Sequence, residues 1–147
     1  MTVGLQISIK PEDLKGIVDS KKAEIQRKIS PAIDQTASRA RQLLTDRTDD
    51  STGLNGPFAP YSKGYVRFRK NVLRKSSPSI VNLNATGKMM GSMAVESSKG
   101  GRIAYLYLAG KSNARKGFLT DRQRPWWGFN GDEALLLSRF FRKRLLR

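Results

Sequence analysis

The stretch AEIQRKISPAIDQTASRARQLL, residues 23–44, decides the fold because its apolar side chains recur at the three- and four-residue intervals of a helix. Pro11 suits a first helical position, and the pattern predicts a long N-terminal helix from there to about Asp46. Lys22 alone interrupts its apolar stripe. The stripe consists of Leu14, Val18, Ile25, Ile29, Ala32, Ile33, Thr36, Ala40, Leu43 and Leu44.

Pro31 stands in the middle of this predicted helix, where a proline costs roughly 3 kcal/mol. Ser30 is able to cap a second helix that has Pro31 at its first position. The apolar stripe, however, keeps its phase across the proline. We therefore expect one kinked helix in preference to two independently oriented ones.

Four short segments carry strand patterns. Residues 3–9 alternate apolar and small or polar side chains, and 80–83 is a short apolar run. Residues 93–97 and 103–108 flank SSKGGR, whose glycines allow a tight reversal, so they predict a hairpin. IAYLYL (103–108) is apolar on both faces and should lie inside the sheet, covered on both sides.

A C-terminal helix follows Asn130 and Glu133, which have the spacing of a capping box. Its apolar face consists of Leu136, Leu137, Phe140, Phe141 and Leu145. The expected fold is α+β, with a small antiparallel sheet of about four strands packed by the long kinked N-terminal helix and the C-terminal helix. We expect a single domain over 1–147, with loops at 45–62 and 109–124, the latter a mobile excursion.

Positive charge is concentrated in the second part of the chain. Residues 1–50 carry 9 basic and 8 acidic side chains, whereas residues 51–147 carry 19 and 4, within a net charge of +16. This asymmetry favours an acidic partner over a merely solvated face. The candidate residues for contact with DNA or an acidic protein are Lys63, Arg67, Arg69, Lys70, Arg74, Lys75, Arg139, Arg142, Lys143 and Arg144.

Composition excludes most familiar active sites. The chain has no cysteine and no histidine, which removes thiol nucleophiles, imidazole acid–base schemes and Cys/His metal sites. ATGKMM (85–90) lacks the first glycine and the hydroxyl residue of a phosphate loop. We therefore expect no catalytic residue, no metal and no cofactor. Without a signal sequence or a long apolar run, we expect a soluble protein that is not in a membrane.

Three segments in order resemble a known pattern: GPFAPYSKGYVRFRK (56–70), VNLNATGKMMGSM (81–93) and RPWWGF (124–129), followed by the last helix. The chain resembles the tailed-bacteriophage virion-morphogenesis, or tail-completion, family, which includes neck and tail-terminator proteins. The matching residues are Phe58, Pro60, Tyr61, Lys63, Leu83, Thr86, Gly87, Met89, Ser92, Arg124, Pro125, Trp126, Trp127 and Gly128.

The resemblance implies a non-enzymatic structural protein that forms a ring, a hexamer, at the head–tail joint of the virion after assembly in the host cytoplasm. Its partners would be further copies of itself, neighbouring neck or tail-tube proteins, and packaged DNA in the channel. A basic nucleic-acid-binding protein is the alternative, since Tyr65, Phe68 and Trp126 lie among cationic residues. These aromatic residues also suit a purely structural role, as anchors of the basic segments.

Six residues are candidates for contact between subunits: Arg124, Pro125, Trp126, Trp127, Met89 and Met90. For the two methionines a place in the core is an equal alternative. Adjacent residues of an extended segment point to opposite sides. We therefore expect one tryptophan to lock the last helix to the sheet and the other to face a neighbouring subunit, where buried tryptophan often dominates binding.

Overall fold

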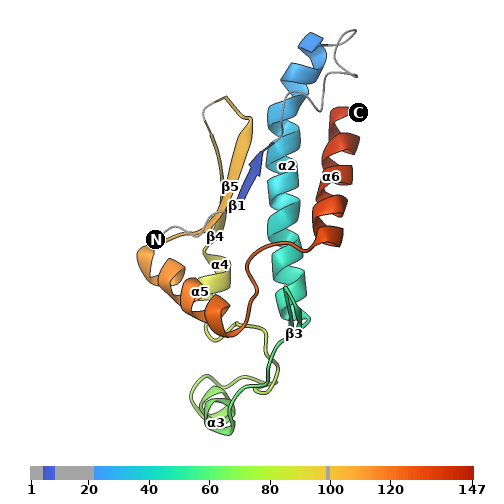
Figure 1. The fold of residues 1–147 in the computed structure, drawn as a ribbon. Coiled ribbons are helices and arrows are strands. Elements are labelled where there is room, and N and C mark those ends of the chain that lie inside the picture. Colours follow the sequence, from blue (N-terminus) through green and yellow to red (C-terminus); the bar gives the residue numbers. More distant parts are fainter. Residues whose placement is uncertain (1–4, 9–21, 99) are drawn as a thin grey trace. The chain divides into compact units, whose positions relative to one another are not determined.

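A computed structural model describes residues 5–8, 22–98 and 100–147 of the chain (Figure 1). The fold is α+β, and its contacts divide the chain into two compact units. We call the described residues 5–8, 22–42, 94–98, 100–107 and 129–147 the sheet unit, and residues 43–93 and 108–128 the cleft unit. Each unit is assembled from segments far apart in the sequence, and the single domain expected over 1–147 stays a prediction.

The sheet unit is built on three strands in the order β1–β5–β4, with bounds Leu5–Ser8, Ile103–Leu108 and Met93–Ser97. β1 is antiparallel to β5, and Leu5 lies opposite Leu106. The predicted hairpin is confirmed, and β5 is the central strand. Its second face is more open than predicted, because Tyr105 is 38% exposed while Ala104 and Leu106 are buried.

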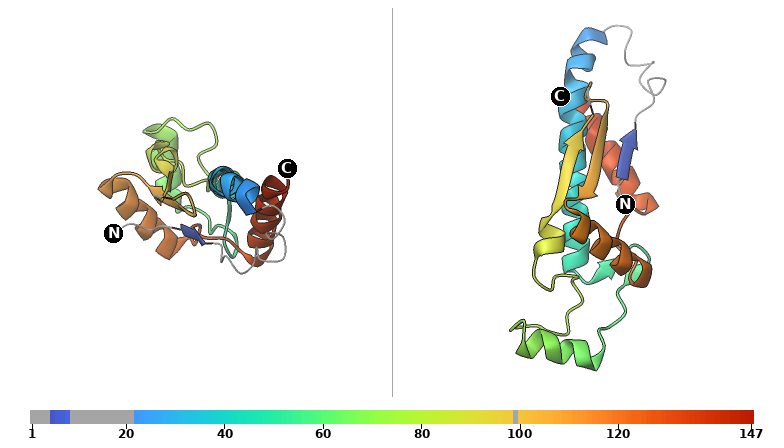
Figure 2. Two further views of the ribbon diagram at one scale, coloured as in Figure 1. Left: turned by 90° about the horizontal axis from the view of Figure 1, so that it is seen from above. Right: turned by 90° about the vertical axis from the view of Figure 1, so that its left-hand side faces the viewer.

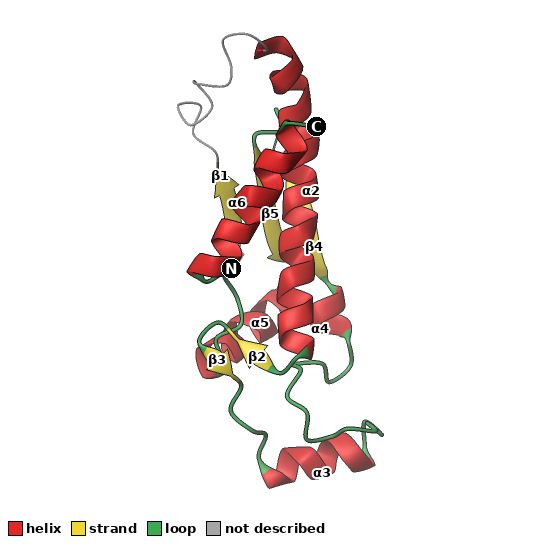
Figure 3. Cartoon of the chain, turned by 90° about the vertical axis from the view of Figure 1, so that its right-hand side faces the viewer, coloured by secondary structure: helices red, strands yellow, loops and turns green. Residues whose placement is uncertain are grey.

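Two helices cover one face of this sheet, as the opposite views of Figures 2 and 3 show. They are α2 (Lys22–Asp49) and α6 (Gly131–Leu145), and α2 continues into the cleft unit after Gln42. The core contains Ile25, Ala32, Ile33 and Ala37 of α2, Ala104 of β5, and Phe141 and Leu145 of α6.

The apolar stripe predicted for α2 is buried, and the helix continues through Pro31 as one α-helix. The alternative of two separate helices is therefore wrong. Ala32 and Ile33 follow the proline directly and are 2% and 1% exposed. Their burial in phase with Ile25 offsets the roughly 3 kcal/mol that an interior proline costs. Leu14 and Val18 lie outside the described residues.

The C-terminal helix α6 begins as predicted. The Asn130 side chain accepts a hydrogen bond from the Glu133 N–H at 2.9 Å, and the Glu133 carboxylate accepts one from the Asn130 N–H at 3.0 Å. Leu137, Phe141 and Leu145 are buried as expected, whereas Leu136 is 42% exposed.

The cleft unit holds the end of α2, a ribbon of two short strands, and three helices. β2 (Thr52–Gly53) pairs antiparallel with β3 (Gly56–Pro57), and α3 (Lys63–Asn71), α4 (Lys88–Gly91) and α5 (Lys111–Gln123) follow. The predicted loop 45–62 therefore contains the last helical turn and this ribbon. Figure 3 shows α3 joined to the rest of the unit by two irregular segments.

The predicted loop at 109–124 is wrong, because most of it forms α5. Gly117 lies in the middle of the helix and is buried. A Cβ atom there would overlap the Leu108 side chain and lie 3.6 Å from Trp126. The glycine therefore lets the helix pack closely, which outweighs its poor helix propensity of about 1 kcal/mol.

The expected fourth strand at 80–83 is also absent from the described structure, which has a three-stranded sheet and the separate ribbon. This segment is irregular because its backbone binds an arginine. The carbonyl oxygens of Pro78 and Ile80 accept hydrogen bonds from Arg69, so Ile80 is not in a strand ladder.

Candidate binding cleft

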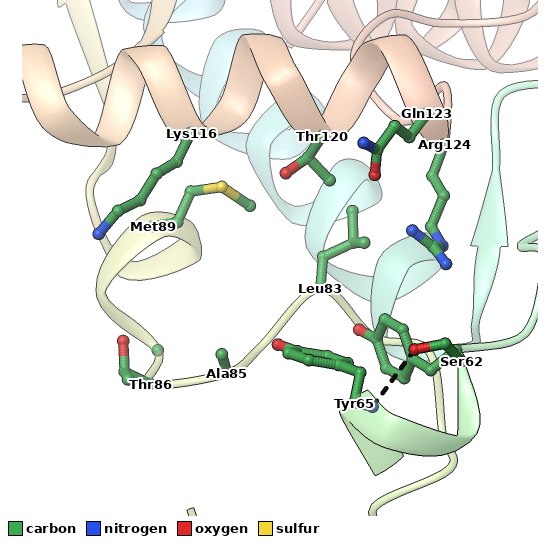
Figure 4. Close-up of a pocket in the computed structure, with 12 residues that line it drawn as sticks. Ser62, Tyr65, Leu83, Ala85, Thr86, Met89, Lys116, Thr120, Gln123 and Arg124 are labelled. Carbon is green, nitrogen blue, oxygen red and sulfur yellow. Dashed lines mark hydrogen bonds between the residues drawn. The ribbon is translucent and has the colours of Figure 1, made fainter. Parts of the chain in front are cut away.

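The three segments that resemble the tail-completion family converge on one cleft of about 600 Å³ in the cleft unit (Figure 4). Figure 4 shows side chains of α5 extending across the cleft toward Leu83 and Met89. The lining residues are Tyr61, Ser62 and Tyr65 from the first segment, Leu83, Ala85, Thr86, Gly87 and Met89 from the second, and Lys116, Thr120, Gln123 and Arg124 from α5 and its end.

Arg124 joins the third segment to the first. Its Nε donates a hydrogen bond to the Ala59 carbonyl oxygen at 3.1 Å, and its Nη2 donates to that of Pro60 at 3.3 Å. Its guanidinium carbon lies 5.1 Å from the centre of the Tyr61 ring, within cation–π range. Arg124 was predicted to contact another subunit, but much of its bonding capacity is used inside the unit.

Tyr61 contacts aromatic and basic residues from more than one of the three segments. Its ring packs edge-on against Tyr65, with centroids 4.8 Å apart, and the Arg69 guanidinium lies over it at 4.8 Å. Leu83 of the second segment lines the same cleft as Tyr61. Burial raises the pKa of the Tyr61 phenol above its ordinary 10.0, although Arg69 acts in the opposite sense. The phenol is therefore neutral at physiological pH.

Arg69 fixes the path of the second segment. It is 1% exposed and donates hydrogen bonds to the carbonyl oxygens of Pro78 at 2.9 Å, of Ile80, and of Asn84 at 3.4 Å. Its Nη2 also donates to Asn82 Oδ1 at 3.2 Å. The prediction that Arg69 meets DNA or an acidic partner is wrong, because its guanidinium is buried and serves backbone groups that lie outside any ladder.

Two residues missed by the sequence analysis hold the RPWWGF box in place. Arg47 Nη2 donates to the carbonyl oxygens of Trp126 at 2.5 Å and Gly128 at 3.1 Å. Asp121 Oδ1 accepts hydrogen bonds from the N–H groups of Trp126 and Trp127, both at 2.9 Å. The one available signal was that Asp121 is an isolated acid in a strongly basic stretch.

The tryptophan pair differs from the prediction. Trp126 is 0% exposed and donates from Nε1 to the Gly117 carbonyl oxygen at 3.3 Å, so it holds α5. Trp127 is half-buried, and its ring meets that of Trp126 edge-on, with centroids 5.1 Å apart. The rings do not point to opposite sides, because consecutive N–H groups that bind one carboxylate oxygen require a turned backbone.

The other residues predicted to contact a neighbouring subunit also differ in how far they are buried. Met90 is buried in the core at 9% exposure and is not available to a partner, whereas Met89 is half-buried and lines the cleft. Pro125 is exposed, and its carbonyl oxygen accepts the Leu54 N–H at 2.7 Å.

The remaining basic candidates lie at the surface of two different units. On and after α3, Lys63, Arg67, Lys70 and Arg74 are exposed and Lys75 is half-buried; on α6, Arg139, Arg142, Lys143 and Arg144 are exposed. On α3, Phe68 is 44% exposed and stacks on Tyr65 with centroids 6.0 Å apart. Phe68 therefore packs against Tyr65 and also leaves part of its side chain exposed at the surface.

Comparisons with protein-family models, curated proteins and solved structures find no match to this chain. The family suggested by the three motifs therefore stays a prediction. Within the described residues, no group of three or more acidic, cysteine or histidine side chains is placed to hold a metal ion. No helix of that part of the chain has both the length and the apolar character that a bilayer crossing requires.

Proposed function

We propose that this chain is a structural subunit of a ring at the head–tail joint of a tailed phage, where it completes or terminates the tail or forms part of the neck. The observation that carries the proposal is the convergence of the three family-like segments. The segments are separate along the chain, yet Arg124 hydrogen-bonds the Ala59 and Pro60 carbonyl oxygens of the first segment, and Arg69 of the first segment hydrogen-bonds Asn82 and Asn84 of the second. A shared site of this kind explains why the motifs occur together.

The exposed charge also suits this role. A ring that closes by rotation needs two different surfaces on each subunit, and the chain offers a basic surface on α3 and another on α6. Either surface would face the packaged DNA in the channel or an acidic neighbouring ring. The subunit would act without catalysis, through these contacts alone.

Electron microscopy of virions assembled without this protein tests the proposal directly. We expect overlong tails, or tails and filled heads that are not joined. Normal tails firmly joined to filled heads would refute the proposal.

The mass of the purified protein in solution provides a second test. A hexamer should appear as a species six times the 16.5 kDa of one chain in light scattering. Since such rings can require a neighbouring ring for closure, the same ring should be counted in reconstructions of the virion. A virion without a ring of this protein would contradict the proposal.

A nucleic-acid-binding protein is the second candidate, favoured by the exposed Phe68 among the cations of α3. With about six phosphate contacts, DNA affinity should fall with salt at a log–log slope of about −5. Arg67→Glu should weaken binding, whereas Arg27→Glu, an exposed residue of α2, serves as the control. Weak binding that is indifferent to salt would eliminate this candidate.

A further inference from the structure

The cleft has the charge of a site for an anion. Its lining includes the basic residues Lys116 and Arg124, and no carboxylate is among the residues that line it. Lys116 lies on α5 and Arg124 directly follows its end, eight residues later, which places their backbones roughly 12 Å apart along the helix axis. A carboxylate is therefore favoured at the cationic wall.

The opposite wall of the cleft is apolar. Leu83, Ala85 and Met89 line it, and Figure 4 shows Met89 and Leu83 facing the side chains of α5. The volume of about 600 Å³ falls in the usual range for ligand sites. A methionine wall adapts to differently shaped apolar groups, so this side suits an aliphatic or aromatic side chain.

The aromatic residues of the cleft are poorly placed to stack on bases. Two guanidinium groups, those of Arg69 and Arg124, already lie over the Tyr61 ring. Tyr65 is packed between the edge of Tyr61 and the Phe68 ring. Because single-stranded nucleic acid binds through open ring faces, the cleft favours a protein ligand over a nucleic acid.

We propose that this cleft binds an acidic segment of a neighbouring protein chain, with a carboxylate at Lys116 and an adjacent apolar side chain against Leu83 and Met89. Thr120 and Gln123 lie between the two cations and offer hydrogen bonds to the peptide backbone. The identity of the neighbour, as another subunit or ring of the virion, rests on the function proposed above. The acidic and apolar character of the bound segment is argued from the cleft alone.

The test selects ligands from displayed random heptapeptides on the purified full-length protein. We expect the selected peptides to contain Asp or Glu beside Leu, Met or Phe. Fluorescence anisotropy then measures binding of a labelled selected peptide to each variant. Lys116→Glu should weaken binding about tenfold, because it replaces attraction by repulsion at a partly exposed pair.

Arg115→Glu is the matched control, since Arg115 is an exposed neighbour on α5 that does not line the cleft. It makes the same change in net charge and should leave affinity within about twofold. Met89→Lys changes the apolar wall of the cleft. We expect that selection from the random heptapeptides fails on this variant. Both Lys116 and Arg115 are exposed, so circular dichroism should show that these two variants remain folded.

Three results would overturn the inference: selection without an acidic and apolar consensus, equal weakening by Arg115→Glu and Lys116→Glu, or tighter binding of a thymidine heptanucleotide than of any selected peptide. These results are independent of virion morphology. Peptide binding together with normal virions would refute the phage role and support the cleft as a peptide-binding site. Failed selection together with unjoined tails would refute peptide binding and support the phage role.

Discussion

The two units of this protein are stabilised by different means. In the sheet unit, apolar side chains of α2, β5 and α6 form one core, and the charged residues of α6 lie outside it. In the cleft unit, three arginines donate hydrogen bonds to backbone carbonyl groups: Arg47 to the RPWWGF box, Arg69 to residues 78–84, and Arg124 to residues 59 and 60.

This difference follows from the amount of regular structure. Strands of two residues leave most carbonyl groups of the cleft unit outside a ladder, and buried polar groups need partners. A guanidinium has five N–H donors in a fixed geometry and can serve several carbonyl groups at once. Part of the positive charge that suggests an outside partner is therefore used inside the protein.

Trp126→Ala should produce the largest loss of stability, because the side chain is 0% exposed and its removal leaves a large cavity in the cleft unit. We expect a decrease of about 3–5 kcal/mol in the free energy of unfolding, measured by urea titration. Trp127→Ala, at a half-buried position, should cost about 1–2 kcal/mol. Equal losses would show that the two residues are equivalent core positions.

Arg69→Met should be the next largest effect and tests the arginine-based stabilisation directly. The change leaves the carbonyl groups of residues 78, 80 and 84 without their donor, so we expect a loss of about 3 kcal/mol. Arg67→Met, at an exposed position of the same helix, should stay within about 0.5 kcal/mol. Both tryptophans lie in the cleft unit, so tryptophan fluorescence is the appropriate probe.

Two glycines on helices of the cleft unit should respond with opposite signs. Gly117→Ala places a Cβ against Leu108 and should cost about 1–3 kcal/mol. Gly64→Ala, on α3, meets nothing within 4 Å and should stabilise by about 0.5–1 kcal/mol. A destabilising Gly64→Ala would mean that α3 packs against something in solution.

Asn130→Ala tests the sheet unit, where hydrogen bonds should matter less than apolar burial. It removes the cap of α6, which is exposed to solvent, and should cost about 1 kcal/mol in a urea titration followed by far-ultraviolet circular dichroism. Ser138→Ala, at an exposed position of the same helix, should cost less than about 0.5 kcal/mol. A loss as large as that of Arg69→Met would remove the contrast between the units.

Tyr61→Phe should give the smallest effect, visible only at high pH. Because burial raises the pKa of the folded phenol above 10.0, Tyr61 contributes stability that is present below that pH and lost as the pH rises through the folded value. The stability of the wild-type protein should therefore begin to fall relative to Tyr61→Phe as the pH approaches the ordinary phenol value of 10.0 and should continue to fall as the pH rises further. Ser62→Ala removes no titrating group there, so its offset from wild type should stay constant.

The regular elements were the predictable part of the fold. Periodicity identified α2, the β4–β5 hairpin and the capped α6, because each has a repeating pattern or a cap of its own. The pattern failed for α5, whose buried face relies on Gly117, and for 80–83, whose apolar residues belong to a segment shaped by Arg69.

The candidate site was predictable only as three separate motifs. The sequence identified Tyr61, Met89 and Arg124 within them, but not that they line one cleft with Lys116. It also misplaced Arg69 at the surface and left the burial of Met90 open, because exposure depends on packing between distant segments. Arg47, which holds the tryptophan box together with Asp121, carries no local signal that distinguishes it from other basic residues, and Asp121 differs from its neighbours only as an isolated acid in a basic stretch.

By itself, the sequence determined that an apolar helix stripe, a hairpin and a capped C-terminal helix would form, and that the charge would be strongly basic. Those properties follow from local periodicity and from composition. The tertiary structure alone decided which cations are exposed and which bind the backbone, because a guanidinium in a loop-rich unit donates to whichever carbonyl groups packing leaves without partners. The same packing brought three distant motifs to a single cleft.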